Sequence, residues 1–266
     1  MDLTPKTRRY PCIGQEGIII PQLGSTSLTG LILLIAWSST GCVALEFDRM
    51  AGTAFPPAQL VNGQSVTLAS IYNEVGIKLT VEEDETGIAA LPSPDACIND
   101  AELSSLENGH RHLSLFPSSS CPFSFCNTYH LYGVVVNHAY EILGACVPGF
   151  ILGVMWDHHT RSAFALFYKD TTLPADPAKF LRTAAHEIGH AFNLHHSDGN
   201  GTSIMTQTDD LTGDPVYQFS DHSQDHLKNH PATCKFPGAI GGAPFTWVVA
   251  EHSWPHEEDL QIYECP

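Results

Sequence analysis

Positive charge is scarce in this chain. Its 266 residues include 12 Lys and Arg against 29 Asp and Glu, a formal net charge of -17 at pH 7. Proteins that bind nucleic acid or an anionic membrane surface concentrate Lys and Arg where they meet phosphate groups. We therefore expect neither nucleic acid nor an anionic membrane as a partner.

Long apolar runs are also missing. The apolar run at residues 31–37 is much shorter than the roughly 20 residues that a transmembrane helix needs. There is no internal repeat and no low-complexity tract. A hydrophobic content of 43% is ample for the core of one domain, and we expect a monomer without a membrane-spanning segment.

The amino-terminal segment has the order of features found in an export signal. A basic stretch at residues 6–9 comes first, then the apolar run, then small residues at 38–44. The pattern predicts cleavage near Ala44, or a lipid anchor at Cys42. The alternatives are that the run is a buried strand or that translation starts further on. Export would place the protein outside the cell or in the cell envelope.

Cysteine usage is consistent with export. Two of the eight cysteines, Cys12 and Cys42, lie in the predicted signal. The other six are an even set that could form three disulfides: Cys97, Cys121, Cys126, Cys146, Cys234 and Cys265. No C-x-x-C pair is present, which argues against a structural zinc site built from cysteines.

Histidine, in contrast, is plentiful, and the densest stretch covers residues 186–196. On a helix, His186 and His190 lie one turn apart, so both ring nitrogens point into the same space. Glu187 lies beside them, where it could act on a metal-bound water. The pattern predicts a zinc ion held by His186, His190 and one further ligand.

The flanking residues predict how this helix begins and ends. Asp176 is a good N-cap and Pro177 suits the first helical position, so we expect a helix over residues 177–192. Its apolar positions form one stripe opposite the two histidines. Asn193 follows, and asparagine tolerates the left-handed conformation that would reverse the chain and bring a later side chain back to the metal.

The whole pattern, His186-Glu187-x-x-His190-x-x-Asn193-x-x-His196, resembles that of the metzincin zinc peptidases, in which glycine stands at the position of Asn193. The resemblance implies that His196 is the third ligand. Residues 203–206 resemble the Met-turn of this family, which implies that Met205 lies beneath the zinc without binding it. Ser197, directly after His196, is similar to the matrixin branch.

Other assignments remain open. His195 is an alternative third ligand. A distal glutamate, as in thermolysin-like enzymes, is another, with Glu251, Glu257 and Glu258 as candidates. Metzincins often use a tyrosine near the Met-turn as a transition-state donor, but Tyr217 stands further along the chain and is expected to be a core or surface residue.

These residues predict a zinc endopeptidase acting on polypeptide. Three neutral histidines leave zinc an open position for water, whose pKa can fall to about 7. Glu187 would take the proton of that water and pass it to the leaving amine. The alternative is a catalytically silent zinc-binding or interaction module on the same scaffold. The presence of Glu187 argues against it, because a structural zinc needs no base.

The fold class predicted is α/β (α+β): a twisted mixed sheet carrying the zinc helix, with a small irregular C-terminal part that ends in a helix. We expect strands at 77–81, 131–136, 150–156 and 162–168, and a helix at 219–230. The catalytic domain would span 45–230, with its upper part ending near 195, between the signal (1–44) and a disulfide-linked extension (231–266). The remaining histidines are interpreted as loop or helix-surface residues: His110, His112, His158, His159, His222, His226 and His230.

Overall fold

The computed structural model describes residues 41–90, 97–112, 128–156, 160–169, 171–196, 201–213, 216–230 and 235–237, all within the compact unit 40–266. No helix among these residues is long and apolar enough to cross a membrane. Several predictions concern residues outside the described ranges: most of the export signal, Cys12, Cys121, Cys126, Cys234, Cys265, His158, His159, Ser197, Glu251, Glu257 and Glu258.

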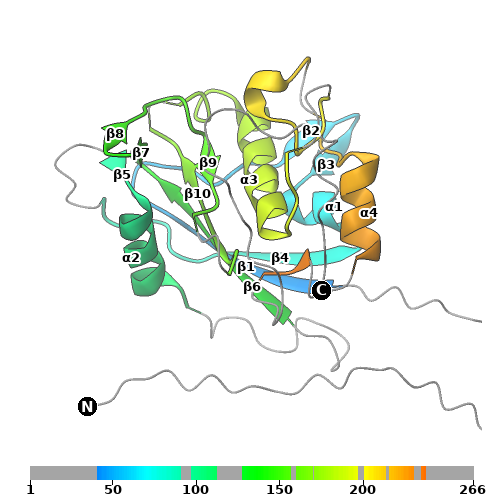
Figure 1. The fold of residues 1–266 in the computed structure, drawn as a ribbon, viewed down its shortest axis with the longest axis horizontal. Coiled ribbons are helices and arrows are strands. Elements are labelled where there is room, and N and C mark those ends of the chain that lie inside the picture. Colours follow the sequence, from blue (N-terminus) through cyan, green and yellow to red (C-terminus); the bar gives the residue numbers. More distant parts are fainter. Residues whose placement is uncertain are drawn as a thin grey trace, which may run out of the picture. The chain divides into compact units, whose positions relative to one another are not determined.

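The described chain is organised around a five-stranded sheet in the order β4-β1-β6-β10-β9 (Figure 1). The strands are β4 (Ile77–Glu83), β1 (Gly41–Arg49), β6 (Thr128–Val136), β10 (Ala163–Phe167) and β9 (Gly153–Val154). The first four run parallel to one another, and only β9 is antiparallel to its neighbour. The predicted α/β fold with a twisted mixed sheet is therefore confirmed.

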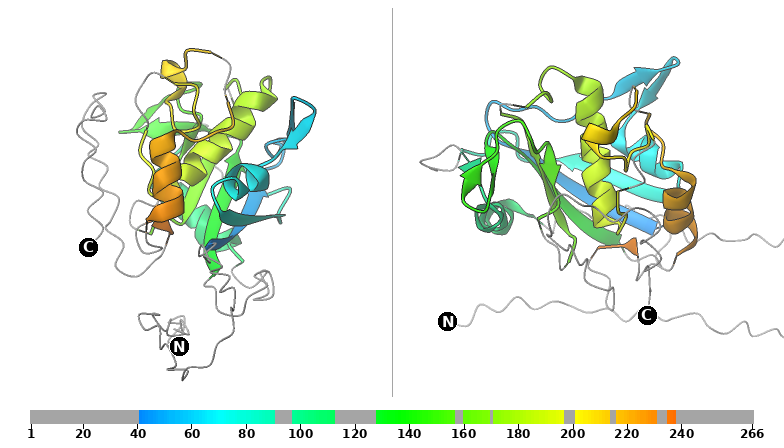
Figure 2. Two further views of the ribbon diagram at one scale, coloured as in Figure 1. Left: turned by 90° about the vertical axis from the view of Figure 1, so that its right-hand side faces the viewer. Right: turned by 45° about the horizontal axis from the view of Figure 1, so that its top comes forward.

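Alternation along the strands divides the core between the two faces of the sheet. In β6, for example, Leu131 and Val135 face one cluster of buried side chains, while Val134 and Val136 face the other. Helices α1 (Leu68–Asn73), α3 (Pro177–Ala191) and α4 (Asp221–Asn229) contribute to the first cluster, and α2 (Asp100–His110) contributes to the second (Figure 2). The sheet is thus covered on both faces, as parallel strands require.

Smaller elements lie outside the main sheet. Strands β2 (Gln59–Val61) and β3 (Gln64–Val66) form a hairpin, and β5 (Cys97–Ile98), β7 (Ala139–Ile142) and β8 (Ala145–Cys146) form a three-stranded sheet. A short 3-10 helix, η2, covers Thr208–Asp210. The sulfur atoms of Cys97 and Cys146 lie within bonding distance, with their Cα atoms 5.8 Å apart.

Some predicted boundaries need correction. The predicted division between residues 44 and 45 falls inside β1, where Cys42 and Ala44 are buried between β4 and β6. The folded part therefore begins at Gly41 or earlier, because removing residues up to Ala44 would delete almost half of the central strand. The strand expected at 150–156 is reduced to the two residues of β9. Helix α2 and the small strands were not predicted.

The start of α3 agrees with the expectation and can be tested. The Asp176 carboxylate accepts a hydrogen bond from the Lys179 amide at 2.9 Å, and Pro177 occupies the first turn. We expect Asp176→Ala to lower the free energy of unfolding by about 1 kcal/mol, because the amide loses its acceptor. Asp176→Asn keeps an acceptor and should stay close to the native value in urea unfolding. Equal destabilisation by both substitutions would contradict this role of the cap.

Candidate metal centre

Helix α3 supplies the first three residues of the site. From Phe180 to Ala191 every side chain of this helix is buried, because one side packs on the sheet and the other meets the chain that follows the helix. His186, Glu187 and His190 are 8%, 6% and 3% exposed. The (i, i+4) spacing places His186 and His190 on the same side of the helix, as the sequence predicted.

The chain leaves α3 through a left-handed reversal. Asn193 has a φ of 64°, as expected of this position. The Asn193 amide donates to the His190 carbonyl at 2.9 Å, and the Leu194 amide donates to the Gly189 carbonyl at 3.0 Å. This pair of bonds is the Schellman motif, which satisfies carbonyls at the helix end while turning the chain back. The reversal carries His196 towards the helix from which the chain has just departed.

Three imidazoles meet as a result. The Nε2 atom of His186 lies 3.1 Å from Nε2 of His190 and 3.0 Å from Nε2 of His196. Among the described residues, these three histidines form a group that could hold a metal ion. His195 is not part of this group. Instead, burial, together with the charge of Arg161, lowers the pKa of His195 to about 4.

Backbone carbonyls determine which ring nitrogens face each other. Nδ1 of His186 lies 2.7 Å from the Ile204 carbonyl oxygen, and Nδ1 of His190 lies 2.8 Å from the Leu194 carbonyl oxygen. Because a carbonyl can only accept, each Nδ1 carries the proton and each neutral ring has an unprotonated Nε2. Two such lone pairs 3.1 Å apart repel each other unless a cation lies between them.

The spacing suits a tetrahedral metal ion. With metal–nitrogen bonds of 2.0–2.1 Å, the edge of a tetrahedron is about 3.3 Å, close to the observed separations of the Nε2 atoms. The rings are also held in the form that binds metal. Burial lowers the pKa of His186 and of His196, and the neighbouring imidazoles lower both further. Neutral imidazole is the ligand form of histidine.

The turn at residues 203–206 packs against α3. Met205 is fully buried, and a Cβ atom added to Gly189 would overlap its sulfur. The glycine in the middle of α3 therefore lets Met205 pack directly against the helix. The same turn supplies the Ile204 carbonyl that orients His186. Met205 thus packs against α3 at Gly189, one residue before His190.

Arg182 is a member of the site that the sequence analysis missed. The residue is 1% exposed, and its guanidinium donates to the carbonyls of Ser203 and Thr206. It thereby holds the turn that positions Met205 and the Ile204 carbonyl. One signal was available: Arg182 stands one helical turn before His186, on the same side of α3. A cation at that position faces the site and needs buried acceptors.

Glu187 is directed towards the edge of the sheet. A Cβ atom added to Gly153 of β9 would lie 2.7 Å from both Cγ and Oε1 of Glu187. Burial raises the pKa of Glu187 to about 8, and the charge of Arg182 opposes this effect. The carboxylate therefore lies against the terminal strand of the described sheet.

Tyr217 is not brought to this site. Its hydroxyl donates to the Ala178 carbonyl, in the first turn of α3, at 3.2 Å. Ala178 precedes His186 by eight residues, which corresponds to about 12 Å along the helix axis. The structure places Tyr217 as a half-buried residue packed against the core, in agreement with the expectation.

Comparison with known proteins finds likeness only between structures. No protein-family model matches the sequence, and no curated protein is significantly similar to it. A zinc-dependent peptidase from Methanocorpusculum labreanum is 15% identical, with a TM-score of 0.40, over 69% of this chain and 99% of that chain. An archaemetzincin from Archaeoglobus fulgidus, complexed with malonate, is 12% identical, with a TM-score of 0.35, over 69% of this chain and 99% of that chain. An archaemetzincin from Methanopyrus kandleri is 14% identical, with a TM-score of 0.39, over 73% of this chain and 97% of that chain. The function of this chain has to be inferred from its own residues.

The reversal at Asn193 gives a prediction. A β-branched residue is strained at a φ of 64°, so Asn193→Val should lower the free energy of unfolding by at least about 1 kcal/mol. Asn193→Gly accepts this conformation and should change stability by less than about 1 kcal/mol. Urea unfolding of both variants measures the difference. A valine variant as stable as the glycine variant would show that the left-handed conformation is not required.

Proposed function

We propose that this chain is a zinc-dependent endopeptidase. The observation that carries the proposal is the meeting of three imidazoles, two of them with an unprotonated Nε2 set by a backbone carbonyl, and the buried carboxylate of Glu187 on the same helix. Imidazole nitrogen is a preferred ligand of zinc, and a site with three protein ligands leaves one position open, as in catalytic zinc sites. A structural zinc site would fill that position with a fourth protein ligand.

When bound, zinc would polarise the peptide carbonyl and lower the pKa of a water molecule to about 7. The residues of the chain divide the remaining work. His186, His190 and His196 hold the ion. An Oε atom of Glu187 takes the proton of the attacking water and later gives it to the amine that leaves. Arg182 keeps the turn at residues 203–206 in place, so that Ile204 orients His186.

The edge strand supports a peptide as the substrate. Strand β9 pairs with β10 on one side and is the last strand of the described sheet on the other. An extended peptide can bind to such an edge as an additional strand. Because Gly153 has no side chain, Glu187 can lie directly against β9, and a peptide along this strand would pass beside its carboxylate.

The ligand assignment is tested by a matched pair of neighbours. We expect His196→Ala to lose zinc, because the ion would keep only two of its three protein ligands. His195→Ala should retain about one zinc ion per chain, since its ring is outside the group of three. Metal analysis after dialysis against a weak chelator measures both. Zinc loss in the His195 variant with retention in the His196 variant would reverse the assignment.

Catalysis is tested at Glu187. Glu187→Gln keeps the shape of the side chain but cannot accept the proton, so we expect cleavage of an unstructured polypeptide to fall at least about 100-fold while zinc remains bound. Prolonged treatment with a strong chelator should abolish cleavage by the native protein. If native protein loaded with zinc cleaves no member of a broad peptide library, the chain is instead a silent zinc-binding module.

A further inference from the structure

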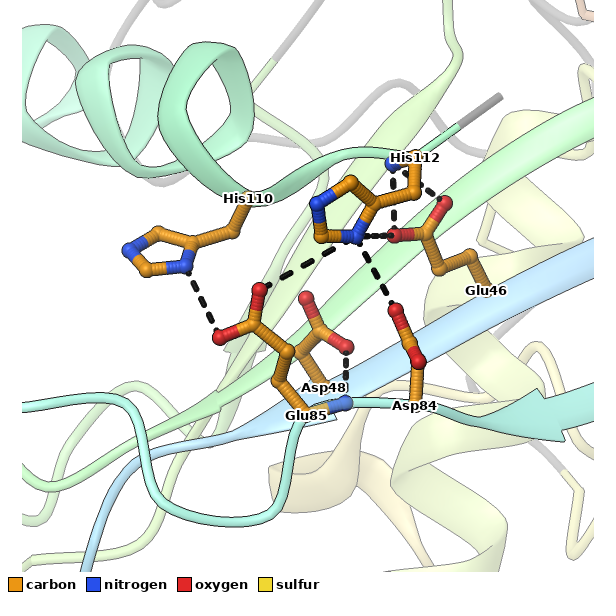
Figure 3. Close-up of polar contacts among 6 residues, drawn as sticks. All are labelled: Glu46, Asp48, Asp84, Glu85, His110 and His112. Atoms are coloured by element: carbon orange, nitrogen blue, oxygen red, sulfur yellow. Dashed lines mark hydrogen bonds and ion pairs between the residues drawn. The ribbon is translucent and has the colours of Figure 1, made fainter. Parts of the chain in front are cut away.

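A second cluster of potential ligands lies on the opposite face of the sheet. Along β1, Leu45 and Phe47 face the core that contains α3, so Glu46 and Asp48 point to the other face. There they meet Asp84 and Glu85, which follow β4, and two histidines at the end of α2. We call these six residues the acidic cluster: Glu46, Asp48, Asp84, Glu85, His110 and His112 (Figure 3).

The ring of His112 lies among three carboxylates. Its Nδ1 atom is 3.0 Å from Oδ2 of Asp84, 3.6 Å from Oε1 of Glu46 and 3.9 Å from Oε1 of Glu85. Ligand atoms of Glu46, Asp84 and His112 all lie within 4.8 Å of one another. These separations resemble the edges of a small coordination polyhedron, which are about 3.3 Å for bonds of 2.0–2.1 Å.

Backbone contacts hold the acidic cluster in this arrangement. The His112 amide donates to both carboxylate oxygens of Glu46, at 2.7 and 2.9 Å. The Glu85 amide donates to Oδ1 of Asp48 at 2.9 Å. These bonds tie the end of α2 and the end of β4 to the central strand. The ligands therefore come from three elements but are fixed relative to one another before any ion binds.

The charge of the acidic cluster is poorly balanced. Four carboxylates are gathered here, and among the described residues only the imidazoles of His110 and His112 form ion pairs with them. Arg111 stands between these histidines in the sequence, but its guanidinium bonds to Glu107, Ser162 and the His130 carbonyl. Glu46 is 2% exposed, and burial raises its pKa; the charge of Asp48 raises it further.

Asp48 adds a separate observation. Its side chain is fully buried, and within the described part of the chain its Oδ2 atom has no hydrogen-bond partner. The Tyr132 hydroxyl lies beside this carboxylate and opposes the rise of its pKa on burial, but the two groups do not have hydrogen-bond geometry. In Figure 3, Oδ2 of Asp48 points towards the space between the carboxylates of Glu85 and Asp84. A buried carboxylate oxygen without a donor is costly unless a cation compensates it.

We propose that the acidic cluster is a second zinc site, independent of the proposed catalytic one. The ligands are Nδ1 of His112 and carboxylate oxygens of Glu46 and Asp84. Glu85, whose Oε1 lies 3.9 Å from Nδ1 of His112, and the buried Asp48 contribute negative charge beside the ion. Imidazole together with carboxylate suits zinc, whereas calcium takes oxygen ligands only. With ligands from three segments, this ion would fasten the segment that follows α2 to the ends of β1 and β4.

A calorimetric titration of the chelator-treated, full-length protein with ZnCl2 tests the proposal. We expect two zinc ions per native chain and one per chain for Asp84→Asn. Glu83→Gln is the matched control, because it neutralises an exposed carboxylate adjacent in the sequence, and it should still bind two. His112→Ala should likewise bind one. Circular dichroism establishes that each variant is folded, and the conservative Asp84 substitution keeps the test valid if His112→Ala does not fold.

The His196→Ala variant separates the two sites. It should retain the zinc that Asp84→Asn loses. If native protein binds a single zinc that His196→Ala removes and Asp84→Asn does not, the second site is absent while the proposed catalytic site stands. If the single zinc is instead lost with Asp84→Asn alone, the proposed function fails and the acidic cluster remains a zinc site. Binding of CaCl2 in place of zinc, unchanged by His112→Ala, would overturn the assignment to zinc.

Discussion

Repulsion between imidazole lone pairs is the constraint on which the rest of the site depends. Nε2 of His186 and Nε2 of His190 lie 3.1 Å apart, and each is left unprotonated because the opposite nitrogen donates to a backbone carbonyl. The two carbonyls come from two turns that follow α3. One belongs to the reversal after Asn193, and the other belongs to the turn that Arg182 holds. The local chain geometry therefore enforces a charge distribution that favours a cation.

Much of this site could be predicted from the sequence because its determinants are local. The (i, i+4) spacing of two histidines, the N-cap at Asp176 and the tolerance of Asn193 for positive φ each act within one or two helical turns. The choice between His195 and His196 depended on a family resemblance. In the structure, the reversal places the ring of His196 with the other two, and His195 is not part of this group.

The parts that could not be predicted depend on contacts between distant segments. Nothing near β1 in the sequence indicates a central strand, because its partners β4 and β6 are far along the chain and its second half contains Glu46 and Asp48. Carboxylates at alternate positions favour an exposed strand when read alone. Likewise, His110 and His112 read as loop residues until α2 is placed over the end of β1. Long-range pairing overrides the local pattern in both cases.

Strand β1 also explains why one sheet can carry the three histidines on one face and the acidic cluster on the other. Its apolar side chains face α3, so the helix that bears the three histidines is held by hydrophobic packing and needs no polar contact with this strand. Its carboxylates face the other side, where the residues at the end of α2 approach them and the His112 amide donates to Glu46 (Figure 3). Because the period of a strand is two residues, exchanging the two faces would require shifting the register of β1 by one residue. Such a shift would bury Glu46 against α3. One pairing register of β1 therefore places the proposed catalytic helix on one face and gathers the carboxylates on the other. A substitution that disturbs β1 should affect both clusters together.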